Sequence, residues 1–151
     1  MVSDTFNLAS LRTIPMFSSL TDEELEVLRP GLTVATFSLG ETIMEEGKPG
    51  GRLYVLLAGQ VKVVACHRLE EETVLHVMEP VEVFGEMSLL TEEPVSATII
   101  ATDYCHMLTL ERDALEPILL RNPNVCVSLL RDAFRRIRRL THEIVRDASG
   151  S

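Results

Sequence analysis

Seven short β-rich runs occupy the middle of the chain, and their spacing restricts the fold more than any other feature of the sequence. The runs recur every 8–12 positions or so and are separated by turn residues, as in a β-sandwich or β-barrel. They are Leu32–Ser38, Thr42–Glu45, Leu53–Leu57, Gln60–Cys66, Thr73–Met78, Ser96–Ala101 and Tyr104–Leu110. Leu39-Gly40 and the glycine-rich stretch 47–51 are predicted turns. Glycine can adopt the positive φ that such turns require, and Pro49 has a fixed φ that suits a turn. The pattern predicts an antiparallel β-structure over residues 32–110.

The residues before this segment have helical patterns. The sequence Thr21-Asp-Glu-Glu24 is a capping box, in which the Thr21 hydroxyl accepts from the Glu24 amide and the Glu24 carboxylate reaches back. Leu20 and Leu25 occupy the positions of a hydrophobic staple. Pro30-Gly31 then ends the helix.

Helical patterns return after Leu110. A short helix is expected over 111–120, limited or kinked by Pro117, and the sequence Asn122-Pro-Asn124 breaks the chain before a last helix over 125–147. Apolar residues of this last helix recur three and four apart and form one stripe. They are Leu130, Phe134, Ile137, Thr141 and Ile144, with Ala133 and Leu140 beside them. A helix of this length spans about 34 Å, so its stripe needs either the β-segment or a second copy of the helix to cover it.

Composition excludes several classes of protein. The chain has 151 residues and a formal net charge of −9, which fits one domain and argues against a protein that coats nucleic acid. The basic residues between Arg131 and Asp147 are interpreted as the solvated face of an amphipathic helix that pairs with acids elsewhere, rather than as a polyanion site. The three cysteines are widely spaced and form no CxxC motif, which favours a reducing compartment. The sequence shows no signal-peptide pattern and no apolar run long enough for a membrane span. A cytoplasmic protein without a membrane segment is therefore expected.

Catalytic and metal-binding motifs are absent from the sequence. It contains no GxSxG, HExxH or P-loop motif, so no enzymatic activity and no catalytic residues are predicted. Cys66-His67 and Cys105-His106 resemble ligand pairs, but adjacent strand residues point to opposite faces and cannot chelate one ion. His76 and Met107 are placed in the core or on the surface rather than on a haem iron. No metal site and no required cofactor are expected.

Several segments together resemble the cyclic nucleotide-binding domain of the catabolite activator/Fnr superfamily. The segment Ile14–Leu25 is similar to the N-terminal helix of that family, and Gly40, Gly47 and Gly59 are among the residues at its glycine positions. The segment Phe84–Leu90, followed by Pro94 and Ser96-Ala-Thr98, resembles the phosphate-binding cassette of the family. The resemblance covers about residues 11–146.

The resemblance implies an α+β fold in one domain over 1–151. An antiparallel β-roll or jelly-roll barrel, residues 32–110 with the cassette at 84–98, would lie between N-terminal helices over 1–31 and C-terminal helices over 111–147. It implies a regulatory module that binds cAMP or cGMP and relays occupancy to its C-terminal helix.

The family also implies a set of ligand-binding residues. The backbone from Gly85 to Ser88 would face the phosphate with its free amides. Glu86 would accept from the ribose 2′-hydroxyl. Alternatively, Glu86 is retained from the family without a ligand role and pairs with a nearby amide. Thr141 lies where relatives contact the base, or else belongs to a helix interface. The implied residues are Phe84, Gly85, Glu86, Met87, Ser88, Val95, Ser96 and Thr141.

Two positions depart from the family pattern. Val95 stands where the family has the arginine that clamps the phosphate, and Ser96 beside it offers a hydroxyl without a charge. Val81 replaces a glycine upstream of the cassette. Loss of a charged hydrogen bond costs about 1.5–3 kcal/mol and a stranded charge about 3–5 kcal/mol, roughly one to three orders of magnitude in affinity. Weak binding of cAMP or cGMP is therefore predicted.

Two other functions remain open at this stage. The domain is alternatively a ligand-free dimerisation or docking module, or the effector domain of a larger regulator. Its final residues follow the last helix closely, so no DNA-binding domain is expected in this chain. In either case the apolar stripe predicts a homodimer through residues 125–147.

Overall fold

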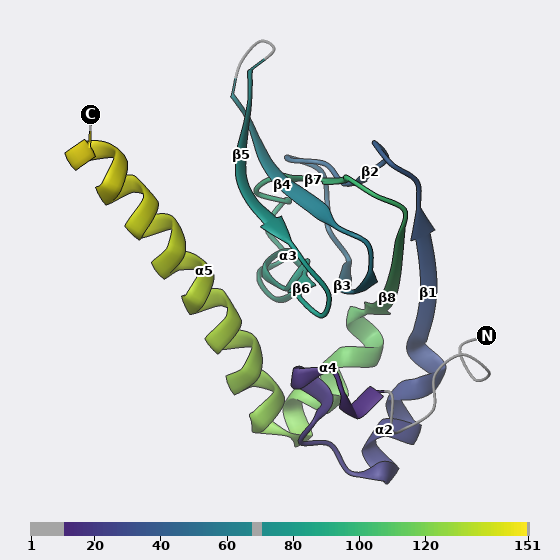
Figure 1. Cartoon of the computed structure of the whole chain (residues 1–151). Helices are drawn as coiled ribbons and strands as arrows, with labels where there is room; N and C mark the ends of the chain where they lie inside the picture. Colours follow the sequence, from purple (N-terminus) through teal and green to yellow (C-terminus); the bar gives the residue numbers. More distant parts are fainter. Residues whose placement is uncertain (1–10, 68–70, 151) are drawn as a thin grey trace.

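The computed structural model describes residues 11–67 and 71–150 (Figure 1). In chain order its elements are η1 (Pro15–Phe17), α2 (Asp22–Leu28), η2 (Arg29–Gly31), β1 (Leu32–Phe37), β2 (Thr42–Met44), β3 (Arg52–Ala58), β4 (Val61–His67), β5 (Glu71–Met78), β6 (Val83–Phe84), α3 (Glu86–Thr91), β7 (Thr98–Ala101), β8 (Cys105–Glu111), α4 (Arg112–Arg121) and α5 (Pro123–Gly150). None of the helices in the described part combines the length and apolarity needed to cross a bilayer.

Two antiparallel sheets form a roll, with helices at both ends of the chain. The strand orders are β1-β8-β3-β6 and β2-β7-β4-β5. Within the first sheet, Val55 of β3 lies opposite Leu108 of β8 on one side and Val83 of β6 on the other. The predicted α+β roll is confirmed, and the seven predicted runs correspond to seven of the strands. The two-residue strand β6 was not predicted, because it is too short to show a period of two.

The predicted capping box is present at the start of α2. The Glu24 amide donates to the Thr21 hydroxyl over 3.2 Å, and the Thr21 amide donates to the Glu24 carboxylate over 3.0 Å. The same carboxylate accepts from Asn122 Nδ2, which ties the N-terminal helices to the junction of α4 and α5. The sequence therefore determines this helix start locally, and the contact with Asn122 fixes its place in the fold.

Among the described residues, two hydrophobic clusters make up the interior. The first joins the N-terminal helices, the β1-β8-β3-β6 sheet and the start of α5 through residues such as Phe17, Leu28 and Leu129. The second fills the roll beside the cassette and includes Tyr54, Phe84 and Val95. The Tyr54 and Phe84 rings stack with centroids 5.0 Å apart, so the second cluster holds the strand that leads into α3.

The C-terminal helices differ from the prediction in extent. Pro117 lies inside α4 without ending it, because proline removes a single helical hydrogen bond. Only Asn122 separates α4 from α5, and its Oδ1 accepts from the Asn124 amide. Pro123 lies in the first turn of α5, where a missing N–H is tolerated. With 28 residues, α5 is about 42 Å long. It begins beside α4 and runs diagonally along one side of the roll (Figure 1).

The described apolar residues of α5 lie on two faces, and the predicted stripe is one of them. Val125 and Leu129 are buried in the first cluster. Leu130, Phe134 and Ile137 are each more than half exposed on the other side of the helix. The predicted stripe is thus one exposed face at Leu130, Phe134 and Ile137, and the side chains of Leu140 and Ile144 lie outside the described part of the structure.

Candidate functional site

A cavity of about 320 Å³ lies between the β2-β7-β4-β5 sheet, the cassette and α5. Its cassette wall consists of Phe84, Gly85, Glu86, Ser88, Val95 and Ser96. Its α5 wall consists of Ala133, Arg136, Ile137 and Arg139. The remaining wall is largely apolar and comes from residues such as Met44, Val63 and Met78. An apolar chamber with a few polar groups on opposite walls is typical of a small-ligand site.

Gly85 makes the turn from β6 into α3 and thereby sets the direction of the cassette. It is the N-cap of α3 and has φ of 88°, in the left-handed region. A side chain at this position would overlap the Arg52 carbonyl oxygen of β3. Glycine is required here both for its φ and for the close approach of the two backbones.

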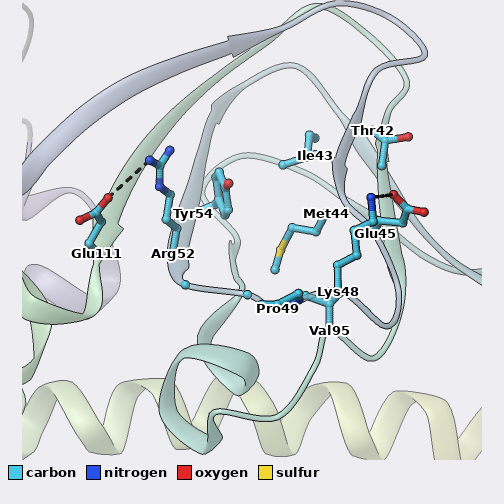
Figure 2. Close-up of a pocket in the computed structure, with 12 residues that line it drawn as sticks. Thr42, Ile43, Met44, Glu45, Lys48, Pro49, Arg52, Tyr54, Val95 and Glu111 are labelled. Atoms are coloured by element: carbon cyan, nitrogen blue, oxygen red, sulfur yellow. Dashed lines mark ion pairs between the residues drawn. The ribbon is translucent and has the colours of Figure 1, made fainter.

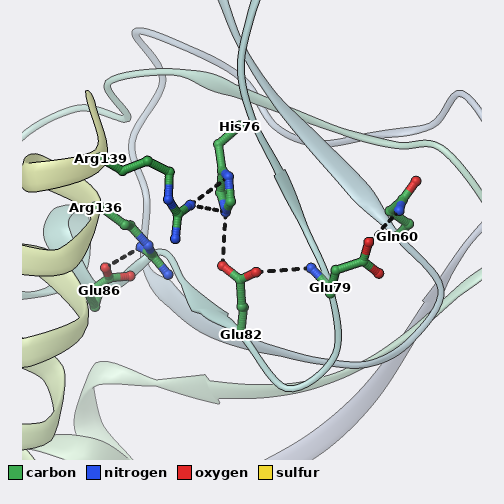
Figure 3. Close-up of polar contacts among 7 residues, drawn as sticks. All are labelled: Gln60, His76, Glu79, Glu82, Glu86, Arg136 and Arg139. Atoms are coloured by element: carbon green, nitrogen blue, oxygen red, sulfur yellow. Dashed lines mark hydrogen bonds and ion pairs between the residues drawn. The ribbon is translucent and has the colours of Figure 1, made fainter. Parts of the chain in front are cut away.

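Glu86 is the buried charge of the cavity. The residue is only 3% exposed, and its Oε1 accepts from Arg136 Nη1 over 2.6 Å (Figure 3). Its Oε2 is buried without a hydrogen-bond partner among the described residues. Burial raises the pKa of the Glu86 carboxyl above its ordinary 4.5, and the positive charge of Arg136 opposes only part of this shift. The cavity therefore contains an acceptor whose hydrogen-bonding capacity is only half used.

A second polar contact joins α5 to β5. Arg139 Nη1 lies 2.6 Å from the ring nitrogens of His76, and His76 Nε2 lies 3.0 Å from Glu82 Oε2 (Figure 3). The other carboxylate oxygen of Glu82 accepts from the Glu79 amide over 3.1 Å. The turn that contains Val81 is thus closed by its own hydrogen bonds and leads directly into β6.

Most of the predicted site residues lie at the cavity. Phe84, Gly85, Glu86, Ser88, Val95 and Ser96 all line it. The Ser88 hydroxyl already donates to the Glu93 carbonyl, whereas Ser96 is exposed. The side chain of Met87 lies outside the described part of the structure. Thr141 is exposed on α5, beyond the residues by which that helix lines the cavity, so its contact with a base stays a prediction.

Sequence reasoning missed the two arginines at the cavity. The basic stripe was interpreted as a solvated face that pairs with acids elsewhere. Arg136 does pair with an acid, Glu86, but it is partly buried at the cavity, and Arg139 contacts His76. The spacing of Val125, Leu129 and Ala133 places Arg136 on the same side of the helix. That register was the available signal, and the high density of arginine from 131 onward obscured it.

The comparison with known families identifies this arrangement. A sequence model described as the cyclic nucleotide-binding domain matches residues 34–122, which include the whole roll from Val34 and the cassette. The chain belongs to the cyclic nucleotide-binding domain family.

Three relatives illustrate the membership. A cAMP-activated global transcriptional regulator of Mycobacterium tuberculosis, described as CRP-like, is 29% identical over 85% of this chain and 58% of its own length. The crystal structure of the catabolite activator protein of Thermus thermophilus has a TM-score of 0.74 and 31% identity, over 86% of this chain and 61% of that one. The regulatory subunit of a cAMP-independent protein kinase A from Trypanosoma brucei has a TM-score of 0.71 and 27% identity, over 80% of this chain and 43% of that one.

This chain spans about three-fifths of the length of the first curated relatives that it matches. The Mycobacterium tuberculosis and Trypanosoma brucei relatives are regulators by their own descriptions. Within the described residues, no group of three or more potential metal ligands is found.

A larger hollow of about 530 Å³ adjoins the domain's cavity and shares Met44 and Val95 with it (Figure 2). Its charged groups pair with each other at the surface, as Arg52 with Glu111 over 3.4 Å and Lys48 with Glu45 over 3.0 Å. These side chains are more than half exposed. The smaller cavity is the better candidate site, because it alone of the two contains the buried Glu86.

The raised pKa of Glu86 predicts how stability changes with pH. Above pH 4.5 the folded domain retains the Glu86 proton longer than the unfolded chain does, so the free energy of unfolding falls as pH rises through this window. Glu86→Gln cannot titrate at this position. We expect the stability of the unmodified domain relative to Glu86→Gln to decrease as pH rises above about 4.5, measured by urea denaturation. A relative stability that increases with pH would show that the ion pair with Arg136 outweighs burial.

Proposed function

We propose that the cavity binds a cyclic nucleotide, cAMP or cGMP, and that the domain reports its occupancy through α5. The observation that carries this proposal is Glu86 Oε2, a buried acceptor without a described partner on the cassette wall of the cavity. A ribose hydroxyl would supply the missing donor. The cavity volume of 320 Å³ falls at the lower end of the usual range for small-ligand pockets, about 300–1,000 Å³.

The same cavity connects a ligand to α5. Glu86 of the cassette contacts Arg136 of α5, and His76 of β5 contacts Arg139. A ligand that hydrogen-bonds to Glu86 changes the surroundings of Arg136 and thus the relative stability of different α5 positions. This contact supports the relay to the C-terminal helix.

Weak binding is part of the proposal. Val95 is buried at the cavity wall and places an apolar side chain where the resemblance to the family implies an arginine. We expect dissociation constants for cAMP and cGMP in the micromolar range or above, a binding free energy no more favourable than about −8 kcal/mol.

Titration calorimetry with cAMP and cGMP tests the proposal. The unmodified domain should bind at micromolar or higher concentration, and Glu86→Ala should weaken binding at least about tenfold through loss of the ribose acceptor. Val95→Arg should strengthen it about tenfold or more. Glu93→Ala is the matched control, because this residue is exposed in the loop that follows α3 and does not line the cavity. Full binding by Glu86→Ala would contradict the assigned role of Glu86, and nanomolar binding by the unmodified domain would contradict the expected weakness.

A ligand-free docking or dimerisation module is the second candidate. Arg136 already occupies one oxygen of Glu86, and a Trypanosoma brucei relative is described as cAMP-independent. Absence of any calorimetric signal with either nucleotide would favour this function. The whole protein is then proposed to use the domain for assembly or as one part of a larger regulator, as the length of the Mycobacterium tuberculosis relative suggests.

Homodimer formation through α5 is proposed for both candidates. Val127, Leu130, Phe134 and Ile137 are exposed at alternating steps of three and four residues, the spacing of a coiled-coil seam. An exposed apolar seam of this kind favours a partner helix.

A further inference from the structure

The cassette cannot balance the charge of a phosphate. Residues 84–98 contain Glu86, Glu92 and Glu93 and no lysine, arginine or histidine. Val95 is buried at the cavity wall, and the Ser88 hydroxyl is engaged by the Glu93 carbonyl. An anion placed against this wall needs a cation from another element, because a buried charge is tolerated only when it is paired.

Helix α5 places such a cation in the cavity. The Arg136 side chain is 22% exposed, lines the cavity and donates to Glu86 Oε1 over 2.6 Å. A guanidinium has five N–H donors in a rigid plane, and only Nη1 takes part in the bond to Glu86. Arg139, one helical turn further, lines the same wall. Other donors of Arg136 therefore remain for a second acceptor.

We propose that Arg136 is the residue that binds the phosphate of the nucleotide, in place of the arginine absent at Val95. This inference rests on the proposed function. Glu86 Oε2 and the Arg136 guanidinium form an acceptor and a donor side by side. A 3′,5′-cyclic nucleotide has the complementary pair, because its 2′-hydroxyl neighbours the carbon that bears the phosphate. One ligand engages both groups while the ion pair stays intact.

The position of Arg136 on α5 gives this inference a consequence for signalling. In this domain the negative charge of the ligand is held by the C-terminal helix itself and not by the roll. A charged nucleotide therefore ties α5 to the cassette, whereas an uncharged nucleoside contacts Glu86 without that added attraction. The domain distinguishes ligands by charge through residue 136.

Comparison of cAMP with adenosine tests the role of Arg136, because adenosine has the ribose hydroxyl and lacks the phosphate. The unmodified domain should bind cAMP at least about tenfold more tightly than adenosine by calorimetry. Arg136→Gln should reduce this ratio to near one, and Arg136→Lys should restore part of it. Arg135→Gln is the matched control, since Arg135 is exposed and pairs with Asp132 of its own helix. Thermal unfolding of each variant checks that it is folded.

The outcomes separate this inference from the proposed function. If cAMP binds and Arg136→Gln weakens cAMP and adenosine equally, Arg136 acts only by positioning Glu86, and the inference is wrong while the proposed function stands. If Arg136→Gln retains the preference for cAMP, another cation binds the phosphate and the inference is again wrong. If the unmodified domain binds no cAMP, both are overturned.

Discussion

Gly85→Ala is expected to destabilise the domain by more than about 2 kcal/mol and to abolish nucleotide binding. The left-handed φ of 88° costs a non-glycine residue about 1–3 kcal/mol. In addition, the new Cβ would overlap the Arg52 carbonyl oxygen, which belongs to the backbone of β3 and cannot rotate away. The cassette would move outward, and Glu86 at the next position would leave the cavity wall.

Gly40→Ala separates the two causes of this effect. Gly40 has a similar φ of 86°, but a Cβ there meets no atom within 4 Å. We expect Gly40→Ala to show only the conformational cost and to leave nucleotide binding unchanged. Urea denaturation and calorimetry on both variants measure the difference. Equal destabilisation by the two substitutions would mean that β3 and the cassette separate readily, contrary to the close contact in the structure.

The fold was predictable from local signals that the tertiary structure preserves. The capping box at Thr21 and Glu24 forms with both of its hydrogen bonds, because all of its atoms lie within one helical turn. The turn glycines Gly40 and Gly59 have the positive φ that their positions between strands require. β6 was the exception, since Val83 and Phe84 are ordered by Val55 and Tyr54 of a distant strand.

The site was predictable only on its cassette side. Glu86 and Val95 belong to a contiguous motif, and the structure places both at the cavity. Arg136 is 50 residues from Glu86 in the sequence, and its role depends on the rotation of α5 about its own axis. That rotation is fixed by the burial of Val125 and Leu129 against the N-terminal helices. The charge pattern alone predicted a solvated face that pairs with acids elsewhere, and it could not distinguish Arg136 from its exposed neighbours Arg135 and Arg138.

Phe134→Asp is expected to convert a dimeric domain into a folded monomer. Phe134 is 59% exposed at the middle of the α5 seam, between Leu130 and Ile137. It is a better test than Ile137, which also lines the cavity. An aspartate in a paired seam would place a charge opposite its symmetry mate and remove a large apolar contact, which together weaken association by several orders of magnitude.

The flanking arginines should contribute little to this dimer. Arg135 lies 3.6 Å from Asp132 of its own helix with a largely exposed side chain, and exposed ion pairs contribute at most about 1 kcal/mol. Light scattering should therefore show a dimer for the unmodified domain at tens of micromolar in both low and high salt, and a monomer for Phe134→Asp. Asn124→Asp, an exposed charge at the start of the same helix, should remain dimeric. A monomeric unmodified domain at these concentrations would mean that the exposed face of α5 needs no second copy, and the homodimer proposal would be wrong.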